Sequence, residues 1–362
     1  MGPWRAGGHT RSSTLNYALR LALMAARDQR GPGRLIPETT MAAGSTVQHS
    51  LLAGSDLLTV ATLSSGELLS ILDLAARVKA DVMPYSRALE HKSVIMIFEK
   101  PSLRTKVTFE VGVHRLGGAP IYMDQSASRL GERESIRDYG KNLERWCQLI
   151  VARVFSHKAL CELAHHAGVP VINALSDRFH PCQALADVLT IREHLKTFRG
   201  VRVAFVGDGN NVCHSLMHAA TLLGMGITVV SPPGYAPAAD VVEECRGFAA
   251  ATGGSLTVTS DLEAVAGHHA VYTDVWVSMG QGEQAAARNK AFAAYQVNAE
   301  LMARASRGLP SPALFMHCLP AQRGVEVTDE VIDSPSSVVY DQAENRMHAQ
   351  NALMLKIFGV VA

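Results

Sequence analysis

The sequence predicts an α/β protein with two domains, each a parallel β-sheet flanked by helices. Short apolar runs alternate with amphipathic helical segments from residue 65 to residue 358, and no internal repeat or low-complexity segment interrupts them. Parallel strands need a long crossover, normally a helix, so this alternation is typical of parallel sheets covered on both faces. A length of 362 residues is enough for two domains with complete cores.

The first domain is expected over residues 51–197. Gly117-Gly118 ends one of its helices, and Pro181 stands at a helix start, where proline replaces an N–H that has no intrahelical partner. The expected helices are 65–79, 105–116, 135–148, 157–167 and 181–196. The expected strands are 94–98, 121–123, 149–154 and 169–173, with a polar loop at 124–134.

A second domain is expected over residues 198–342, with Phe198-Arg199-Gly200 as the hinge. Its expected helices are 214–223, 240–251, 261–266, 283–294 and 298–305. Its expected strands are 201–206, 227–230, 256–259, 270–273, 314–316 and 338–340. A closing helix is expected over residues 343–358.

Composition and charge exclude several classes of protein. Lys+Arg total 34 and Asp+Glu 33, a net charge of +1, so nothing indicates a nucleic-acid partner. No apolar run is long enough to cross a membrane, so no membrane span is expected. The six cysteines are scattered without a C-x-x-C pair, which argues against a zinc ribbon or redox dithiol and favours reduced intracellular thiols.

Residues 1–50 are expected to be an extension that is disordered or partly helical. Residues 1–40 carry six arginines but only Asp28 and Glu38 as acids, and this composition resembles a mitochondrial transit peptide. That origin would place the protein in the mitochondrial matrix. The alternative, which we favour, is a cytoplasmic protein with a bacterial extension, or with Met41 as the true start.

Polar residues gather where expected strands end, which is where ligands bind in parallel sheets. Ser102–Thr105 lies between a strand and a helix, so its backbone N–H groups and hydroxyls could hold a phosphate or another dianion. For this stretch alone, a simple capped helix with a surface arginine is an equally good interpretation. Arg153 interrupts an apolar run, where an unpaired charge is costly, so it should reach a partner or an anionic ligand.

Gly207–Asn211 follows an expected strand and opens a helix, as a dinucleotide-binding loop does. However, Val212 replaces the third glycine of that motif, and the next strand ends in Val230-Ser231-Pro232 without an acid. Nicotinamide binding therefore stays only as an alternative. The two asparagines of the loop could instead hydrogen-bond a carboxylate or ammonium of a small ligand, or simply form the turn.

Four further residues could take part in chemistry, and three of them also have a structural interpretation. His180, at a helix start, could donate to a carbonyl oxygen that gains charge, although such a histidine is more often a cap. Asp274 follows a strand and could orient an amine. Cys318 stands beside His317, which permits a thiol nucleophile, but a buried inert cysteine is commoner. Arg346 opens the closing helix and could face the cleft or the solvent.

Taken together and in this order, these motifs resemble the ornithine carbamoyltransferase family over about residues 55–360. They are Ser102-Leu103-Arg104-Thr105, Arg153, His180-Pro181-x-Gln183, Gly207–Asn211, Asp274-x-x-x-Ser278-Met279-Gly280, His317-Cys318-Leu319-Pro320 and Glu344-Asn345-Arg346. The family often has threonine where Leu103 stands, and glutamine or histidine where Arg129 stands. Related enzymes for aspartate, putrescine or acetylornithine differ in the amine-binding loop, so Ser278-Met279-Gly280 favours ornithine.

The resemblance implies transfer of the carbamoyl group of carbamoyl phosphate to the δ-amine of L-ornithine, giving L-citrulline and phosphate in arginine metabolism. It implies that the first domain binds carbamoyl phosphate, the second binds ornithine, and the closing helix, residues 343–362, packs back on the first domain. It also implies a homotrimer or a multiple of trimers, with no metal and no organic cofactor. Whether the reaction serves arginine synthesis or breakdown is left open.

The resemblance also implies the site residues. Carbamoyl phosphate would be bound by Ser102, Leu103 through its backbone, Arg104, Thr105, Arg129, Arg153, His180, Gln183, Cys318, Leu319 and Arg346. Ornithine would be bound by Asn211, Asp274, Ser278 and Met279. Catalysis would rest on Arg153, His180, Cys318 and Asp274. Arg129 could reach the phosphate site of a neighbouring subunit.

The chemistry of an amine nucleophile agrees with this set. The δ-amine is a cation in water and must lose a proton before it attacks. We expect Asp274 and a Cys318 thiolate to capture and position the ammonium, with Cys318 as an orienting group and not a covalent nucleophile. A non-catalytic binding module on the same fold is the alternative of a different class, and the complete polar set argues against it.

Overall fold

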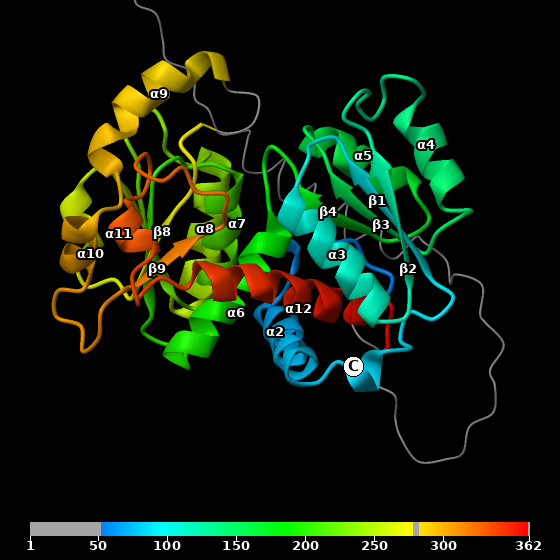
Figure 1. Ribbon diagram of the computed structural model, residues 1–362, viewed down its shortest axis with the longest axis horizontal. Helices are drawn as coiled ribbons and strands as arrows, with labels where there is room; N and C mark the ends of the chain where they lie inside the picture. Colours follow the sequence, from blue (N-terminus) through cyan, green and yellow to red (C-terminus); the bar gives the residue numbers. More distant parts are fainter. Residues whose placement is uncertain (1–51, 278–281, 361–362) are drawn as a thin grey trace, which may run out of the picture. The chain divides into compact units, whose positions relative to one another are not determined.

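The computed structural model describes residues 52–277 and 282–360 (Figure 1). The predicted extension over residues 1–50 lies outside the described residues. So do Ser278 and Met279, two of the predicted ornithine-binding residues.

The first sheet has four parallel strands in the order β2-β1-β3-β4. The strands are β1 (Ser93–Phe98), β2 (Ala119–Asp124), β3 (Leu149–Arg153) and β4 (Val171–Leu175). Its helices are α2 (Ser65–Ala80), α3 (Leu103–Arg115), α4 (Ile136–Leu143) and α5 (His157–His166). Side chains alternate across the sheet, so Met96 packs on the α2 and α3 side, while Ile95 and Ile97 pack on the α4 and α5 side.

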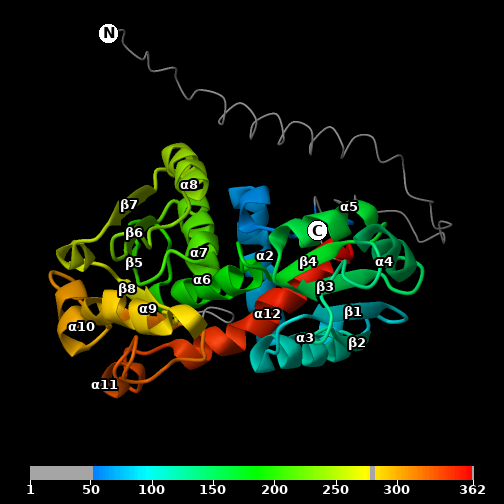
Figure 2. The same ribbon diagram turned by 90° about the horizontal axis from the view of Figure 1, so that it is seen from above.

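The second sheet has five parallel strands in the order β7-β6-β5-β8-β9. The strands are β5 (Arg202–Val206), β6 (Gly226–Val230), β7 (Ser255–Thr259), β8 (Ala270–Thr273) and β9 (Leu314–His317). Helix α6 (Pro181–Leu195) follows β4 in the chain and precedes β5. The helices after β5 are α7 (Asn211–Leu222), α8 (Ala239–Thr252), α9 (Ala285–Phe292), α10 (Ala299–Ala305) and α11 (Asp329–Ile332). Figure 2 shows α7 and α8 on one side of this sheet, where they share a core with it, and α10 and α11 belong to the core of the other face.

The strand order puts a topological switch point in each sheet. In the first sheet the chain moves outward from β1 to β2 and later in the opposite direction from β3 to β4, so β1 and β3 are central neighbours. In the second sheet β5 and β8 are central neighbours for the same reason. The loops that leave neighbouring strands at a switch point diverge and leave a crevice between them, which is where open α/β sheets bind ligands.

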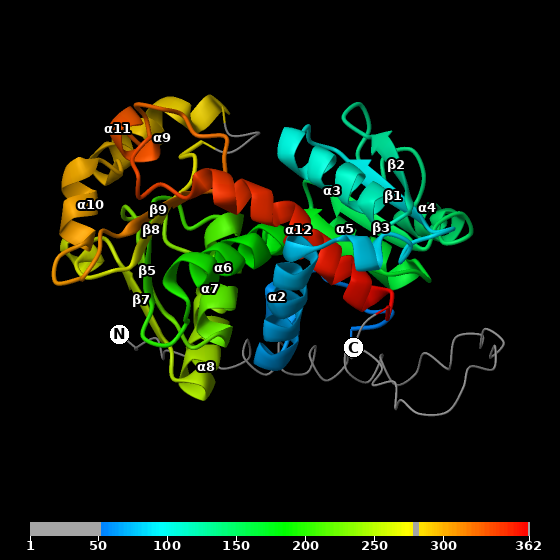
Figure 3. The same ribbon diagram turned by 60° about the horizontal axis from the view of Figure 1, so that its bottom comes forward.

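The closing helix α12 (Val339–Ile357) packs against α2, α3 and α6, helices of the first domain, as expected (Figures 1 and 3). One apolar core runs through both sheets and includes Phe98, Phe205 and, on α12, Leu353. The two sheets are therefore covered on one side by a shared layer of helices. Because α6 and α12 belong to this layer, their side chains can contact residues of both sheets.

Two expectations about regular structure were wrong. Val338–Tyr340 was expected as a strand, but the chain makes a single bridge between Phe315 and Ser337 and then enters α12 at Val339. The helix expected over 135–148 ends at Leu143, and the backbone N–H of Gln148 already bonds to Ser93 of β1. In both places tertiary contacts override local propensity.

Within the described residues, no helix is both long and apolar enough to cross a membrane.

Two helical glycines form a matched pair that tests the contact of α3 with α12. A Cβ atom at Gly112 of α3 would lie 2.2 Å from Oδ1 of the buried Asn351 on α12, whereas a Cβ at Gly247 of α8 would meet nothing within 4 Å. We expect Gly112→Ala to lower the free energy of unfolding by about 1–3 kcal/mol. Gly247→Ala should raise it by about 0.5–1 kcal/mol, because alanine loses less backbone entropy in a helix.

Denaturant titration of the two variants beside the wild type measures both changes. Each substitution adds one methyl group to the interior of a helix, so Gly247→Ala is the control for the effect of alanine on helix stability. Stabilisation by both substitutions would show that α12 does not press on α3 at Gly112.

Candidate functional site

The two switch points carry most of the residues that the sequence singled out. Phe98 and Arg153 are partners in the register of β1 and β3, so the turn that follows β1 begins beside Arg153. Phe205 and Tyr272 are partners in β5 and β8, so Gly207–Asn211 and Asp274 leave neighbouring strands. Cys318 follows β9, the next strand in that sheet.

The turn after β1 is a capped helix start that faces an arginine. Ser102 is the N-cap of α3, and its Oγ accepts from the backbone N–H of Thr105 at 3.3 Å. The Thr105 Oγ1 in turn accepts from Nη2 of Arg346, which reaches across from α12, at 3.1 Å. The remaining N–H groups of the first turn have no intrahelical partner and form the positive end of the helix dipole. Leu103, the first helical residue, is 74% exposed, so its side chain is not part of this turn's packing.

Three guanidinium groups converge on this turn without a carboxylate to pair with. Arg153 and Arg346 are buried and Arg104 is half-buried, and among the described residues none of the three makes a salt bridge. Burial first, and then the charges of Arg346 and Arg104, lower the pKa of Arg153 to about 10. Like charges this close repel each other, so the cluster is suited to a bound anion.

His180 and Gln183 complete this half of the site at the start of α6. Burial, followed by the charges of Arg346 and Arg153, lowers the pKa of His180 well below its ordinary value, so the imidazole is neutral. Its Nδ1 is buried and has no partner among the described residues. The Gln183 Oε1 accepts from Nη1 of Arg346 at 2.6 Å. A neutral imidazole and an amide oxygen can therefore serve a small group that has both N–H donors and a carbonyl.

The second half of the site is built around Asp274. Its Oδ2 accepts from Nδ2 of Asn210 at 2.8 Å, and its Oδ1 accepts from the Cys318 thiol at 3.1 Å and from the backbone N–H of Val275 at 2.8 Å. Asp274 is buried and, among the described residues, has no cationic partner. A buried carboxylate at a strand end is an arrangement that would accept an ammonium group.

The expected Cys318 thiolate is contradicted by this geometry. Burial first, and then the charge of Asp274, raise the pKa of Cys318 well above its ordinary value, and Arg104 offsets this only in part. The thiol is therefore protonated and donates to the Asp274 carboxylate. Asp274 alone supplies the negative charge in this part of the site, with Cys318 as its hydrogen-bond donor.

His317 does not act as a base toward Cys318. Its Nδ1 accepts from the backbone N–H of Leu319 at 2.9 Å, and its Nε2 faces Oε1 of the buried Glu326 at 3.2 Å. The thiol-nucleophile interpretation therefore lacks its base. The ligand atoms of Asp274, His317 and Cys318 lie within 4.8 Å of one another, but both ring nitrogens of His317 are already engaged, so this trio is not an arranged metal site.

The remaining predicted residues lie at the margins of this arrangement. Asn211 donates from Nδ2 to the carbonyl oxygen of Ser176 at 2.6 Å and so ties the second domain to the first. Leu319 lies beyond Cys318 with a positive φ of 57°. Arg129 is exposed and stacks on the ring of Phe155 at 4.2 Å from its centroid.

The dinucleotide alternative fails on the packing of its loop. A Cβ atom at Gly209 would lie 2.3 Å from the backbone nitrogen of Pro237, so this glycine is needed for contact with another loop and not with a pyrophosphate. Asp208 is engaged by Arg288, whose Nε also donates to the carbonyl oxygen of Trp276 at 2.5 Å. This buried pair anchors the loop to α9.

Several residues that shape the site were missed by sequence reasoning. Buried Glu99 accepts from the backbone N–H groups of Leu130 at 2.7 Å and Phe155 at 2.6 Å, and so fixes the polar loop that carries Arg129. Asn210, one of the two asparagines that the sequence singled out, caps α7 and donates to Asp274, a contact that the sequence did not predict. Asp187 lies fully buried behind Gln183. A charged residue in an apolar stretch was the available signal for Asp187 and Glu99, the same signal that identified Arg153.

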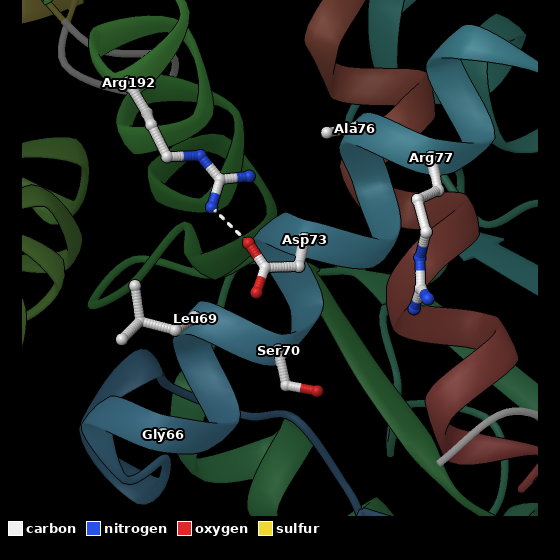
Figure 4. A pocket seen from close by; sticks show the side chains of 7 residues that line it. All are labelled: Gly66, Leu69, Ser70, Asp73, Ala76, Arg77 and Arg192. Atoms are coloured by element: carbon white, nitrogen blue, oxygen red, sulfur yellow. Dashed lines mark hydrogen bonds and ion pairs between the residues drawn. The ribbon is translucent and has the colours of Figure 1, made fainter. Parts of the chain in front are cut away.

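A surface hollow of about 720 Å³ lies elsewhere, between α2 and α6 (Figure 4). Arg192 of α6 reaches Asp73 of α2 across it at 2.6 Å, and Arg77 points away from this pair. None of its lining residues belongs to the motifs described above. The hollow is therefore a feature of helix packing and not of the site.

Comparison with known proteins places both halves of the chain. The family models described as "Aspartate/ornithine carbamoyltransferase, carbamoyl-P binding domain" and "Aspartate/ornithine carbamoyltransferase, Asp/Orn binding domain" match residues 55–193 and 199–357. The chain is 50% identical over 301 residues to an ornithine carbamoyltransferase from Shewanella oneidensis, covering 83% of this chain and 98% of that protein. It is 48% identical over 311 residues to an anabolic ornithine carbamoyltransferase from Pyrococcus furiosus, covering 85% and 98%.

A comparison with solved structures finds the same family. The structure of ornithine carbamoyltransferase from Pyrococcus furiosus superposes with a TM-score of 0.81 at 47% identity, covering 86% of this chain and 99% of that one.

The protonation of Cys318 can be measured by alkylation. In a Cys161→Ser background, which removes the exposed thiol, Cys318 should react slowly with iodoacetamide at pH 8 because its pKa is raised. Asp274→Asn removes a charge that raises this pKa, so we expect the rate to increase about tenfold for each unit by which the pKa falls. The unreactive control is Cys318→Ser. A rate that is already fast in the Cys161→Ser protein and unchanged by Asp274→Asn would show that Cys318 is a thiolate.

Proposed function

The chain belongs to the aspartate/ornithine carbamoyltransferase family, and we propose that it transfers the carbamoyl group of carbamoyl phosphate to the δ-amine of L-ornithine, giving L-citrulline and phosphate. The observation that carries the proposal is the pairing of two unlike half-sites. One has three unpaired guanidinium groups at a helix start, and the other has a buried carboxylate without a cation. A dianionic donor and a cationic amine are the ligands that these two half-sites complement.

The donor would bind at the start of α3. The free N–H groups of Ser102–Thr105, including that of Leu103, together with Arg104, hold the phosphate, as helix starts do for anions. Arg153 and Arg346 lie between the phosphate and the carbamoyl group. The bridging oxygen gains charge as it leaves, and these guanidiniums stabilise it without reorganising.

The carbamoyl group itself would lie against α6. Neutral His180 donates to the carbonyl oxygen, which becomes more negative in the transition state. The Oε1 of Gln183 accepts from the carbamoyl N–H₂ and thereby orients the group. Cys318 and the backbone of Leu319 lie on the side from which the amine approaches.

Ornithine would bind to the second domain with its side chain directed toward Asp274. Asp274 accepts from the δ-ammonium and positions it, while Cys318 keeps the carboxylate oriented as a thiol donor. The ammonium releases one proton to solvent, the resulting amine nitrogen forms a bond to the carbamoyl carbon, and the bond from that carbon to the phosphate oxygen breaks. A phosphate oxygen accepts the proton that the product nitrogen releases. Asn211, Ser278 and Met279 are proposed to bind the rest of the amino acid.

Assembly and cellular role are proposals of the same kind. Helix α3 packs against β2, and each carries an exposed apolar side chain: Val107 is 43% exposed and Ile121 is 45% exposed. Such side chains suit a contact between subunits in a homotrimer. Arg129 would then face a neighbouring subunit's phosphate. Light scattering gives the mass in solution, and a monomer would contradict the trimer.

The anabolic relative supports a role in arginine biosynthesis. A cytoplasmic location is proposed, and N-terminal sequencing of the mature protein tests it.

Parallel assays with four amines test the function. With carbamoyl phosphate, L-ornithine should be used with a kcat/KM at least about a hundredfold higher than putrescine, N-acetylornithine or L-aspartate, because a site built for polar groups rejects amines that lack them. Asp274→Asn should lower kcat/KM for ornithine, putrescine and N-acetylornithine alike, because it removes the carboxylate that accepts from the terminal ammonium these amines share. A preference for another amine would reassign the acceptor. Binding of carbamoyl phosphate without turnover of any amine would support the non-catalytic module instead.

A further inference from the structure

Asp187 is a buried carboxylate that joins three elements behind the site. It lies in α6, one turn beyond Gln183, and is 0% exposed. One of its oxygens, Oδ1, accepts from Nε2 of Gln183 at 2.8 Å, from Nε2 of Gln342 at 2.6 Å and from the Tyr272 hydroxyl at 3.4 Å. These donors come from α6, α12 and β8, so a single oxygen contacts the closing helix and both domains.

A carboxylate in this position is costly and therefore requires an explanation. Among the described residues Asp187 forms no salt bridge, and its Oδ2 has no hydrogen-bond partner. Burial raises its pKa to about 7, against the opposing effect of its hydrogen bonds and of the charge of Arg346. Apolar residues of similar volume commonly stabilise a buried site as well or better, so stability alone does not account for this residue.

The effect of Asp187 on Gln183 is to choose which end of the amide faces the site. An amide has a donor end and an acceptor end, and the two are nearly identical in shape. Because the Gln183 N–H₂ group donates to Asp187, its oxygen must point the other way, where it accepts from Arg346 at 2.6 Å. With the amide reversed, the N–H₂ group would face the guanidinium and no acceptor would face the carbamoyl N–H₂.

The same oxygen orients a second amide. The Gln342 N–H₂ group donates to Asp187, so its Oε1 is free to accept from the backbone N–H of His317 at 3.0 Å. His317 precedes Cys318. One acceptor thus sets the direction of two glutamine amides, one toward the carbamoyl group and one toward the loop that holds Cys318.

We propose that Asp187 is a positioning residue for the carbamoyl group, acting through the amide orientation of Gln183. This inference rests on the proposed function, because it assigns Asp187 a task in the binding of carbamoyl phosphate. The carboxylate does not touch the substrates. Its contribution is to keep the acceptor end of Gln183 directed into the site.

A double-mutant cycle tests whether Asp187 acts through Gln183. Asp187→Asn keeps the shape but offers either an oxygen or an N–H₂ group to the glutamine, so the amide is no longer held in one orientation. We expect kcat/KM for carbamoyl phosphate to fall about 10- to 100-fold, the range for residues that orient a ligand-binding group. In a Gln183→Met background, the same substitution should cost about tenfold less in kcat/KM than it does in the wild type, because only the effect through Gln342 is left.

Thr190→Val is the matched control on the same helix. The Thr190 hydroxyl is buried, donates to the carbonyl oxygen of Ala186 at 2.8 Å and accepts from Asn345 at 2.9 Å. This substitution should lower Tm with kcat/KM unchanged. A purely structural Asp187 would behave like Thr190, with a lower Tm and unchanged kinetics, and that result would overturn the proposal. An equal loss in both Gln183 backgrounds would overturn it as well.

Binding separates this inference from the proposed function. The same cycle is measured on the Kd of carbamoyl phosphate by calorimetry, which requires no turnover. A non-additive binding cycle in a protein that fails to make citrulline would support Asp187 and count against the proposed function alone. If Asp187→Asn does not fold, Asp187→Ser enters the same cycle, since its shorter side chain also leaves the Gln183 amide without a fixed acceptor.

Discussion

Arg104, Arg153 and Arg346 place three positive charges close together at the start of α3, and the packing around them has to offset their burial and their repulsion. Two of the three guanidiniums are buried, and the charge of Arg346 lowers the pKa of both Arg104 and Arg153. Among the described residues none of the three forms a salt bridge, and the charge of Asp187 offsets the burial of Arg346 only in part. Buried like charges are expensive, and water can replace only part of their solvation. The fold holds them together beside the positive end of α3, where only a bound anion relieves the cost.

The packing that bears this cost is the helical layer shared by the two sheets. Arg346 belongs to α12, which is buried along most of its length against α2, α3 and α6. The core beneath it is continuous between the domains, so the arginine cannot swing away without disrupting apolar contacts. The same layer holds Asp187 and Gln183, and their hydrogen bonds to α12 extend the arrangement toward Asp274 and Cys318. The anion site and the amine site are therefore parts of one packed unit.

Much of this could be predicted from the sequence, and the exceptions have physical causes. The apolar runs located the nine strands of the described residues. The central strands are continuous apolar segments because they are buried on both faces, whereas the edge strands β2 and β7 are partly exposed. Arg153 was identified because a charge inside an apolar run is costly to bury without a partner. Strand order is not encoded locally, so the placement of Arg153 and Asp274 at the two switch points came only with the structure. The protonation of Cys318 likewise depends on burial and on Asp274, 44 residues away in the chain. Val338–Tyr340 was predicted wrongly because its strand propensity is weaker than the contacts that begin α12.

Thermal unfolding of the wild type and of Arg153→Met, with and without inorganic phosphate, tests whether the three guanidinium groups form an anion-binding site. A chloride salt of equal ionic strength is the control for screening. If the three arginines form an anion-binding site, phosphate binds the folded protein and raises the Tm of the wild type. Arg153→Met is then at least as stable as the wild type in chloride, because one repelling charge is gone, and it gains little from phosphate. A variant that is destabilised by about 3–5 kcal/mol in chloride, as when a buried ion pair is broken, together with a wild type indifferent to phosphate, would contradict the account.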